Sequence, residues 1–218
     1  MSGSETGQSK RPTGIAGLDN VTRGGLPAGQ ATLVLGEAAA GKTVLGLQVL
    51  ANAVDRGEGA VFVTFEESPA QIRRDAASFS WGEALIASTS WQLIDARPHF
   101  GVEAAGAFDI EGLLSVVASA AETMQTSWLV FDGIDQLLQY QPDQRSAIEQ
   151  VRRLDAYCAE HGWTLLLTGK ATDERVTPAG LEGIEFLLSA TLVLSARMVN
   201  QQLNRSLRIA KYRGSGHC

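Results

Sequence analysis

A run of eight residues in the first quarter of the chain has the residue types and spacing needed to bind a triphosphate. The run is Gly36-Glu37-Ala38-Ala39-Ala40-Gly41-Lys42-Thr43, which matches the phosphate-loop pattern of glycine, four residues, glycine, lysine and threonine. The glycines allow positive φ angles and a close backbone approach, so that N–H groups can surround an anion. We expect Lys42 to contact the β- and γ-phosphates, Thr43 to bind Mg²⁺, and Val44 to belong to the same nucleotide-binding segment.

Three carboxylates that follow apolar runs are candidates for metal binding and catalysis. Asp132 has the position of the second Mg²⁺-side carboxylate of phosphate-loop enzymes, although an aspartate there can also merely cap a turn. Glu66 and Glu67 end another run, where a carboxylate can orient the water that attacks a phosphate. Their negative charge can instead simply favour the N-terminus of the next helix. Because adjacent strand residues point in opposite directions, we expect one glutamate, not both, to face the nucleotide.

A basic segment near the end of the chain supplies two cations. Lys211 and Arg213 are two residues apart on a predicted strand, so their side chains lie on the same face. From there they can neutralise charge that develops during phosphoryl transfer. The same spacing also fits a basic strand edge that only faces solvent. The residues by themselves leave both interpretations open.

Strands and helices alternate along most of the chain and bring these residues toward one sheet edge. Strands are expected at residues 31–35, 60–65, 91–95, 128–131 and 163–168. Helices are expected from Val44 to about 57, from Ser68, over 109–125, and from Asp143 to about 162. A hairpin of residues 191–195 and 206–212 closes the sheet. The pattern predicts an α/β fold with a mostly parallel central sheet, helices on both faces and a C-terminal β-hairpin.

Length and composition fit one globular domain. The chain has 218 residues, 44% of them apolar, and a net charge of −6, which argues mildly against a surface that wraps nucleic acid. The sequence has no apolar run as long as a membrane span, and residues 1–10 lack the apolar core of a signal peptide. Cys158 and Cys218 show no metal-site spacing. We expect a flexible tail at 1–12, one domain at 13–218, and a cytoplasmic location without membrane contact.

The chain as a whole resembles the KaiC-type branch of the RecA-like ATPases. The resemblance rests on the phosphate loop and on segments spread along the predicted domain. These segments are Thr13-Gly-Ile-Ala-Gly-Leu-Asp19, Gly24-Gly-Leu-Pro27, Val61-Phe-Val-Thr-Phe-Glu-Glu-Ser-Pro69, Ser78-Phe-Ser-Trp-Gly82, Phe108-Asp109, Trp128-Leu-Val-Phe-Asp132, Glu185-Phe186 and Lys211-Tyr-Arg-Gly-Ser-Gly-His217. Together they cover nearly one whole KaiC lobe.

This resemblance implies a RecA-like phosphate-loop NTPase that uses ATP and Mg²⁺ and works as a homo-oligomeric ring, hexameric in the family. It implies that Lys42 and Thr43 bind phosphate and Mg²⁺ and that Asp132 is the Walker B aspartate. Glu66 and Glu67 match the catalytic glutamate pair, and Glu67 aligns better with the general base of the wider group. The expected activity is slow ATP hydrolysis coupled to signalling or to the binding of a partner protein.

The resemblance also favours a role for the basic segment. Lys211, Arg213, Ser215 and His217 match the family segment that reaches the nucleotide of the neighbouring subunit. We therefore expect ATP to lie between subunits, with these four residues acting in trans.

Two departures from the family pattern affect the expected activity. The loop contains Glu37-Ala-Ala-Ala40, which should make it stiffer, and Glu37 adds negative charge beside a polyanion, so we expect modest nucleotide affinity. In the autophosphorylating KaiC lobe a Ser-Thr pair precedes the hairpin strand, but the aligned residues here are Phe186 and Leu187. The chain thus matches the ATPase-type lobe, and autokinase activity is not expected.

Two other functions fit part of the sequence. A DNA-repair or recombination ATPase of the same fold needs a basic loop near residues 169–183. Acidic residues outnumber basic ones in that loop, which repels nucleic-acid phosphate on balance; its charged residues are Lys170, Arg175, Asp173, Glu174 and Glu182. A nucleotide-gated binding module with little turnover is also consistent with the loop, but Glu66 and Glu67 argue against it.

Overall fold

The computed structural model describes residues 9–97, 110–139, 141–171, 181 and 183–213. Its strands are β1 (Lys10–Arg11), β2 (Leu26–Pro27), β3 (Ala31–Gly36), β4 (Gly59–Thr64), β5 (Trp91–Asp95), β6 (Thr126–Asp132), β7 (Thr164–Lys170), β8 (Ala190–Val199) and β9 (Gln202–Tyr212). Its helices are α1 (Ala16–Val21), α2 (Lys42–Asp55), α3 (Pro69–Ala77), α4 (Gly82–Ala87), α5 (Ile110–Met124), α6 (Ile134–Leu138), α7 (Gln144–His161) and α8 (Ile184–Leu187).

Seven of these strands form one sheet in the order β5-β4-β6-β7-β3-β8-β9. All neighbouring pairs from β5 to β8 are parallel, and only β8 and β9 pair antiparallel. The expected α/β fold with a mostly parallel sheet and a terminal hairpin is therefore confirmed. Because β4, β6, β7 and β3 run in the same direction, their carboxyl ends meet at one edge, where an open α/β sheet places its ligand.

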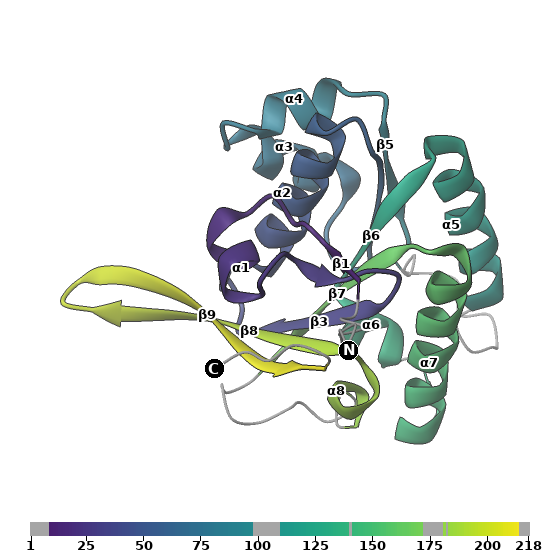
Figure 1. Ribbon diagram of the computed structural model, residues 1–218. Helices are drawn as coiled ribbons and strands as arrows, with labels where there is room; N and C mark the ends of the chain where they lie inside the picture. The colour runs from purple at the N-terminus through teal and green to yellow at the C-terminus, as the bar shows by residue number, and fades with distance from the viewer. Residues whose placement is uncertain (1–8, 98–109, 140, 172–180, 182, 214–218) are drawn as a thin grey trace, which may run out of the picture.

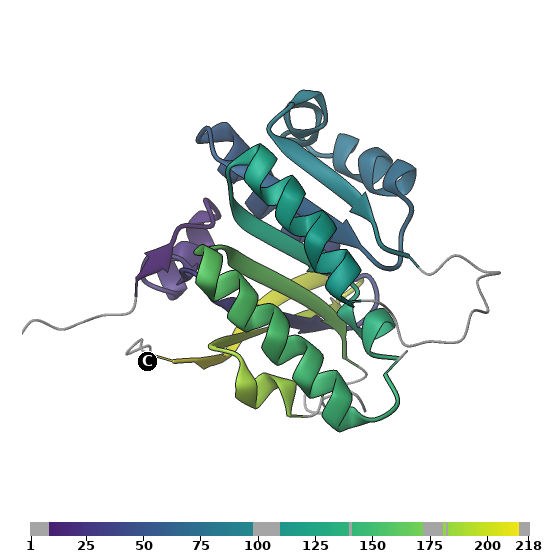
Figure 2. The ribbon, with the colours of Figure 1, turned by 90° about the vertical axis from the view of Figure 1, so that its right-hand side faces the viewer.

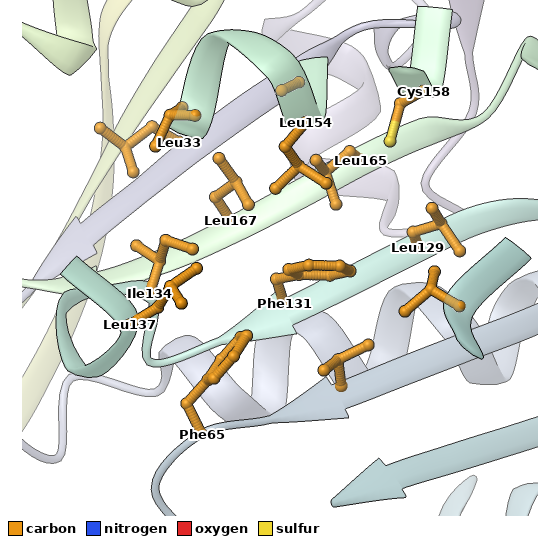
Figure 3. Close-up of a cluster of buried hydrophobic side chains, with 14 of the residues drawn as sticks. Leu33, Phe65, Leu129, Phe131, Ile134, Leu137, Leu154, Cys158, Leu165 and Leu167 are labelled. Atoms are coloured by element: carbon orange, nitrogen blue, oxygen red, sulfur yellow. The ribbon is translucent and has the colours of Figure 1, made fainter. Parts of the chain in front are cut away.

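Helices cover both faces of the sheet (Figures 1 and 2): α2, α3 and α4 lie on one face, and α5 and α7 lie on the other. Strand β6 shows how the sequence specifies this arrangement. Its Trp128 and Val130 belong to the apolar cluster beneath α2 and α3, whereas Leu129 and Phe131 belong to the cluster beneath α5 and α7. Figure 3 shows the second cluster, in which side chains of the strands meet those of α6 and α7. The sequence of a strand that is buried on both faces is a nearly continuous run of apolar residues.

Helix α2 packs against the sheet through a glycine that leaves no room for a side chain. A Cβ atom at Gly46 would be 2.8 Å from Cγ1 of Val130 on β6, too close for ordinary contact. Gly46 is buried, as are Leu47, Val49 and Leu50 of the same helix. This packing fixes the position of the first turn of α2, which contains Lys42 and Thr43.

The expected helix boundaries are confirmed where the sequence contains capping residues. The Ser68 side chain accepts a hydrogen bond from the Gln71 N–H (3.2 Å) at the start of α3, with Pro69 as the first helical residue. The Asp143 carboxylate accepts from the Ser146 N–H (2.7 Å) at the start of α7. Gly162 ends α7 with a φ of 70°, a left-handed conformation that glycine adopts without strain.

Three local features differ from the expectations. The tail expected at 1–12 overlaps ordered structure, because Lys10–Arg11 pair with Leu26–Pro27 and the Arg11 side chain donates to the Thr164 hydroxyl; residues 1–8 lie outside the described ranges. The turn-rich segment before the phosphate loop contains the short helix α1. The hairpin is longer than expected, since β8 and β9 continue to a turn at Asn200–Gln201, whose positive φ angles of 50° and 64° suit a tight hairpin.

The hairpin extends away from the body of the domain (Figure 1). Among the helices that the structure describes, none has the length and apolar character needed to cross a bilayer.

Candidate active site

The predicted phosphate loop connects β3 directly to α2, as its motif requires. Gly41 has a φ of 100° at the N-terminus of α2, and a Cβ atom at Gly36 would be 2.7 Å from the Leu194 carbonyl oxygen, so both positions need glycine. The Lys42 ammonium donates to the carbonyl oxygens of Gly36 and Glu37, at 2.9 Å each. The loop thus curves around its own lysine, and the N-terminus of α2 provides partial positive charge for an anion.

Asp132 lies beside the loop in a hydrogen-bonded network. The Thr43 hydroxyl donates to its Oδ2 (3.0 Å), and the Thr168 hydroxyl donates to its Oδ1 (2.6 Å) while accepting from the Gly133 N–H (2.9 Å). Asp132 is only 2% exposed. Burial raises the pKa of this carboxyl group, against the opposing effect of the Thr168 and Thr43 hydrogen bonds. A cation at Oδ2 would favour the ionised form.

The two adjacent glutamates point into different surroundings. The Thr64 hydroxyl accepts from the Glu67 N–H (3.2 Å) and donates to its carbonyl (2.8 Å), which fixes the turn after β4. Glu67 Oε2 is buried and has no hydrogen-bond partner among the described residues. The Glu66 carboxylate instead forms an ion pair with Lys170 and accepts a long hydrogen bond from Gln136 (3.5 Å). The two side chains diverge, but not through strand alternation, because β4 ends at Thr64 and both glutamates lie in the turn that follows it.

A cavity of about 610 Å³ opens beside the phosphate loop. Its lining includes Gly41, Lys42, Thr43 and Glu67, together with residues of α3 and of the hairpin. Glu66 and Lys170 do not line it. The structure therefore places Glu67 in one cavity with the loop and Glu66 outside that cavity.

Comparison with known proteins identifies the family of the chain. A protein-family model described as "ATPase: KaiC" matches residues 11–218. The chain belongs to the KaiC ATPase family. It is similar to the circadian clock protein KaiC2 of Synechocystis sp. (34% identity over 214 residues, 95% of this chain and 37% of the relative). It is also similar to the circadian clock oscillator protein KaiC of Prochlorococcus marinus subsp. pastoris (38% over 216 residues, 95% and 42%).

The same comparison relates the chain to KaiC3 of Synechocystis sp. (30% identity over 216 residues, 97% of this chain and 42% of the relative). The chain thus spans about two fifths of the length of the curated KaiC proteins that it matches. That share is consistent with a single KaiC-like lobe, with the RecA-like phosphate-loop fold that the sequence predicts.

KaiC-type ATPases imply Mg²⁺, and the residues of this chain suit that ion. Thr43 and Asp132 present a hydroxyl and a carboxylate oxygen 3.0 Å apart next to the loop. Mg²⁺ prefers oxygen ligands and usually binds through one or two protein groups together with substrate phosphates. The described part of the chain has no cluster of three or more His, Cys, Asp or Glu side chains suited to a metal, so a fully protein-ligated metal centre is not seen there.

The basic segment lies apart from the phosphate loop of its own chain. The Lys211 ammonium donates to the carbonyl oxygens of Glu185 (2.8 Å), Phe186 (2.9 Å) and Leu188 (2.6 Å) at the end of α8. The Arg213 guanidinium donates to the same Phe186 carbonyl (2.6 Å), so the two cations share one face, as expected. Ser215 and His217 lie outside the described residues.

Sequence reasoning missed several polar residues of this site. Thr168 is buried at the end of β7 and links Asp132 to Gly133. Asp75 of α3 and Arg205 of β9 line the cavity. Thr168 could have been found by the rule that named Asp132 and Glu66, since it also ends an apolar strand at the same sheet edge. Asp75 and Arg205 could not, because their position depends on how α3 and the hairpin pack.

Proposed function

We propose that this KaiC-family domain binds ATP with Mg²⁺ at the phosphate loop and hydrolyses it, with Glu67 as the general base. The observation that favours this most is the position of Glu67, which shares the cavity with Lys42 and Thr43 and has a buried oxygen without a partner among the described residues. Burial, followed by the charge of Asp75, raises the pKa of Glu67. A base works best when its pKa approaches the working pH.

The residues of the chain suggest a division of tasks. The loop N–H groups and Lys42 would hold the β- and γ-phosphates, and burial lowers the pKa of Lys42, partly offset by the charge of Asp132. Thr43 and Asp132 would hold Mg²⁺, which neutralises charge on the phosphate oxygens when bound. Glu67 would take a proton from the attacking water as the bond to the leaving ADP oxygen breaks.

The proposal includes a ring in which Lys211 and Arg213, with Ser215 and His217, act on the nucleotide of the neighbouring subunit. Support comes from the shared face of Lys211 and Arg213 and from their distance in the fold from the loop of their own chain, whose cavity they do not line. Mass in solution, measured with and without ATP and Mg²⁺, tests assembly; a monomer under both conditions would contradict the ring.

Relatives named as circadian clock proteins favour a regulatory role in the cytoplasm, in which the nucleotide state controls binding of a partner protein. Proteins that co-purify with the ATP-loaded but not the ADP-loaded domain would test this part. The described residues offer no observation that favours the DNA-repair alternative: Lys170 belongs to β7, and the other charged residues named for that loop lie outside the described ranges.

Hydrolysis is tested by exchanging each glutamate in turn. Glu67→Gln should bind ATP normally but lose most turnover in a phosphate-release assay, since a general base contributes about 10²–10⁴-fold. Glu66→Gln is the matched control and should retain far more activity. The opposite ranking would reassign the base, and unchanged ATP affinity in Lys42→Ala would show that the loop does not bind phosphate.

The wild-type chain is also used to test whether the protein phosphorylates itself. After incubation with ATP and Mg²⁺ the wild-type chain should show no added phosphate by intact mass spectrometry, because Phe186 and Leu187 stand at the aligned acceptor positions. A phosphorylated species mapped to this segment would contradict the proposal.

A further inference from the structure

Lys170 is a second lysine, besides Lys42, at the sheet edge that holds the phosphate loop and the Asp132 network. It is the last residue of β7, and its ammonium forms an ion pair with Glu66. The two side chains are 46% and 30% exposed, so the pair is accessible to solvent. The Lys170 N–H donates to Asp135 Oδ1 (3.0 Å), which anchors the backbone while leaving the side chain free to change partner.

The strand register places Lys170 beside the start of the phosphate loop. On the neighbouring parallel strand β3 its register partner is Gly36, and the adjacent Ala171 N–H donates to the Gly36 carbonyl (3.0 Å). The Lys42 ammonium contacts this same carbonyl oxygen (2.9 Å). Lys170 does not line the cavity of about 610 Å³ beside the loop, but adjacent strands are about 4.8 Å apart, so a lysine side chain at this end of β7 is long enough to approach the terminal phosphate that Lys42 would hold.

Glu66 contacts Gly133 and Gln136 in addition to its ion pair with Lys170. Its Cγ packs close to Gly133, where a Cβ atom would be only 2.9 Å away. Its carboxylate accepts from Gln136 on the other side (3.5 Å). Exposed ion pairs of this kind are weak, whereas a terminal phosphate offers an ammonium more negative charge and several acceptor oxygens.

We propose that Lys170 is a further phosphate-binding residue, whose ammonium pairs with Glu66 in the nucleotide-free chain and moves to the terminal phosphate of a bound nucleoside triphosphate. This inference rests on the proposed function, since it assigns one more residue to the same site. A diphosphate lacks the group that Lys170 would contact. The exchange therefore distinguishes triphosphate from diphosphate and releases Glu66 only when the triphosphate is bound.

The test compares the binding of two nucleotides to four proteins. The ligands are ADP and the β,γ-imido analogue of ATP, each with Mg²⁺, measured by calorimetry on the wild-type chain and on Lys170→Met, Lys170→Arg and Glu66→Gln. Lys170→Met should weaken the ATP analogue about tenfold and ADP less than twofold, because one charge-assisted contact to the terminal phosphate is lost. Lys170→Arg should retain most of the affinity. Glu66→Gln should strengthen the analogue roughly threefold, because the competing carboxylate charge is removed.

Other results would overturn the assignment. Equal changes for ADP and the analogue in Lys170→Met, or no change for either, would mean that Lys170 only positions Glu66. Weaker binding of the analogue in Glu66→Gln would mean that the pair itself is needed in the bound state. These outcomes leave the proposed function intact as long as the wild-type chain binds both nucleotides and Lys42→Ala binds neither. A wild-type chain that binds neither nucleotide would overturn both proposals.

Discussion

The phosphate-loop region and the C-terminal basic segment hold their functional side chains in opposite ways. Around the loop, the hydroxyl groups of Thr43 and Thr168 both donate hydrogen bonds to Asp132, next to the proposed Mg²⁺ and phosphate sites. In the basic segment, Lys211 and Arg213 donate to carbonyl oxygens of α8, which are ordinary backbone acceptors of the same chain. The phosphate-loop region thus presents its polar groups at the proposed ligand site. In the basic segment, both cations are hydrogen-bonded to backbone carbonyl groups of their own chain.

This difference suggests that the two regions are used at different stages. The loop region can receive nucleotide in a single chain, because its contacts lie within β3, α2, β6 and β7. The basic segment would have to exchange the α8 carbonyls for phosphate oxygens of another subunit. That exchange would couple ring assembly to nucleotide binding, because a ligand that binds only the ring stabilises the ring.

The largest expected effect comes from removing the arginine of the basic segment. Arg213→Ala should lower turnover by about 10³–10⁵-fold, as for other arginines supplied in trans, or by less where Lys211 shares the task. Mixing it with Glu67→Gln should restore part of the activity, because some mixed interfaces combine an intact Glu67 with an intact Arg213. Phosphate release from the mixture measures this.

The mixing experiment needs a control for assembly. Native mass spectrometry must show that the two variants enter the same rings. If they do and no activity returns, the site is not shared between subunits, and the basic segment differs from the loop region simply because it has no part in catalysis.

A smaller effect is expected from Asp75, which lines the cavity near Glu67. Glu67 must be ionised to act as a base, so turnover should fall as the pH falls through its raised pKa. The Asp75 charge is the second largest cause of that rise, after burial. Asp75→Asn should therefore lower the pKa of Glu67 and move the acid limb of the pH–rate profile to lower pH.

The control for this prediction is Glu122→Gln, which removes one exposed charge on α5, away from the cavity. It should leave the acid limb unchanged. An acid limb that moves equally in both variants would reflect net charge, and one that does not move in Asp75→Asn would point to a base other than Glu67.

The smallest expected effect concerns the alanines of the loop. Ala39 has a φ of 62°, a left-handed conformation that costs an ordinary L-residue roughly 1–2 kcal/mol. Ala39→Gly should stabilise the chain by about 1 kcal/mol and raise its melting temperature by about 2–4 °C. Ala38→Gly is the matched control, because Ala38 has no positive φ, and it should not stabilise. Equal effects in thermal unfolding would show that the loop stores no such strain.

Most of the fold could be predicted because it depends on local signals. The doubly buried strands read as apolar runs, and caps such as Ser68, Asp143 and Gly162 marked helix ends. The short helices α4, α6 and α8 could not be predicted, since each is six residues or fewer, too short for a periodic apolar pattern. The ordered strand at Lys10–Arg11 was missed because its pairing with Leu26–Pro27 is a tertiary contact between polar or isolated residues.

The candidate site divides in the same way. The loop and Asp132 follow from motif and strand ends. The separation of Glu66 from Glu67 was expected from strand alternation, whereas the turn after β4 produces it. The residues that surround these groups were not predicted from the sequence. Thr168, Lys170 and Asp75 lie near site residues that are distant in sequence, so only the strand order and helix packing reveal them.

The close packing of α2 on the sheet has a consequence for how this chain tolerates mutation. Gly46 contacts no ligand in the proposed site, yet it lies one turn after Lys42 and allows α2 to lie against Val130. One added methyl group there would clash with Val130 and tilt the helix away from β6. This tilt would also displace the Lys42 ammonium and the Thr43 hydroxyl in the first turn of α2. The proposed nucleotide site therefore depends on a glycine in the core that touches no ligand.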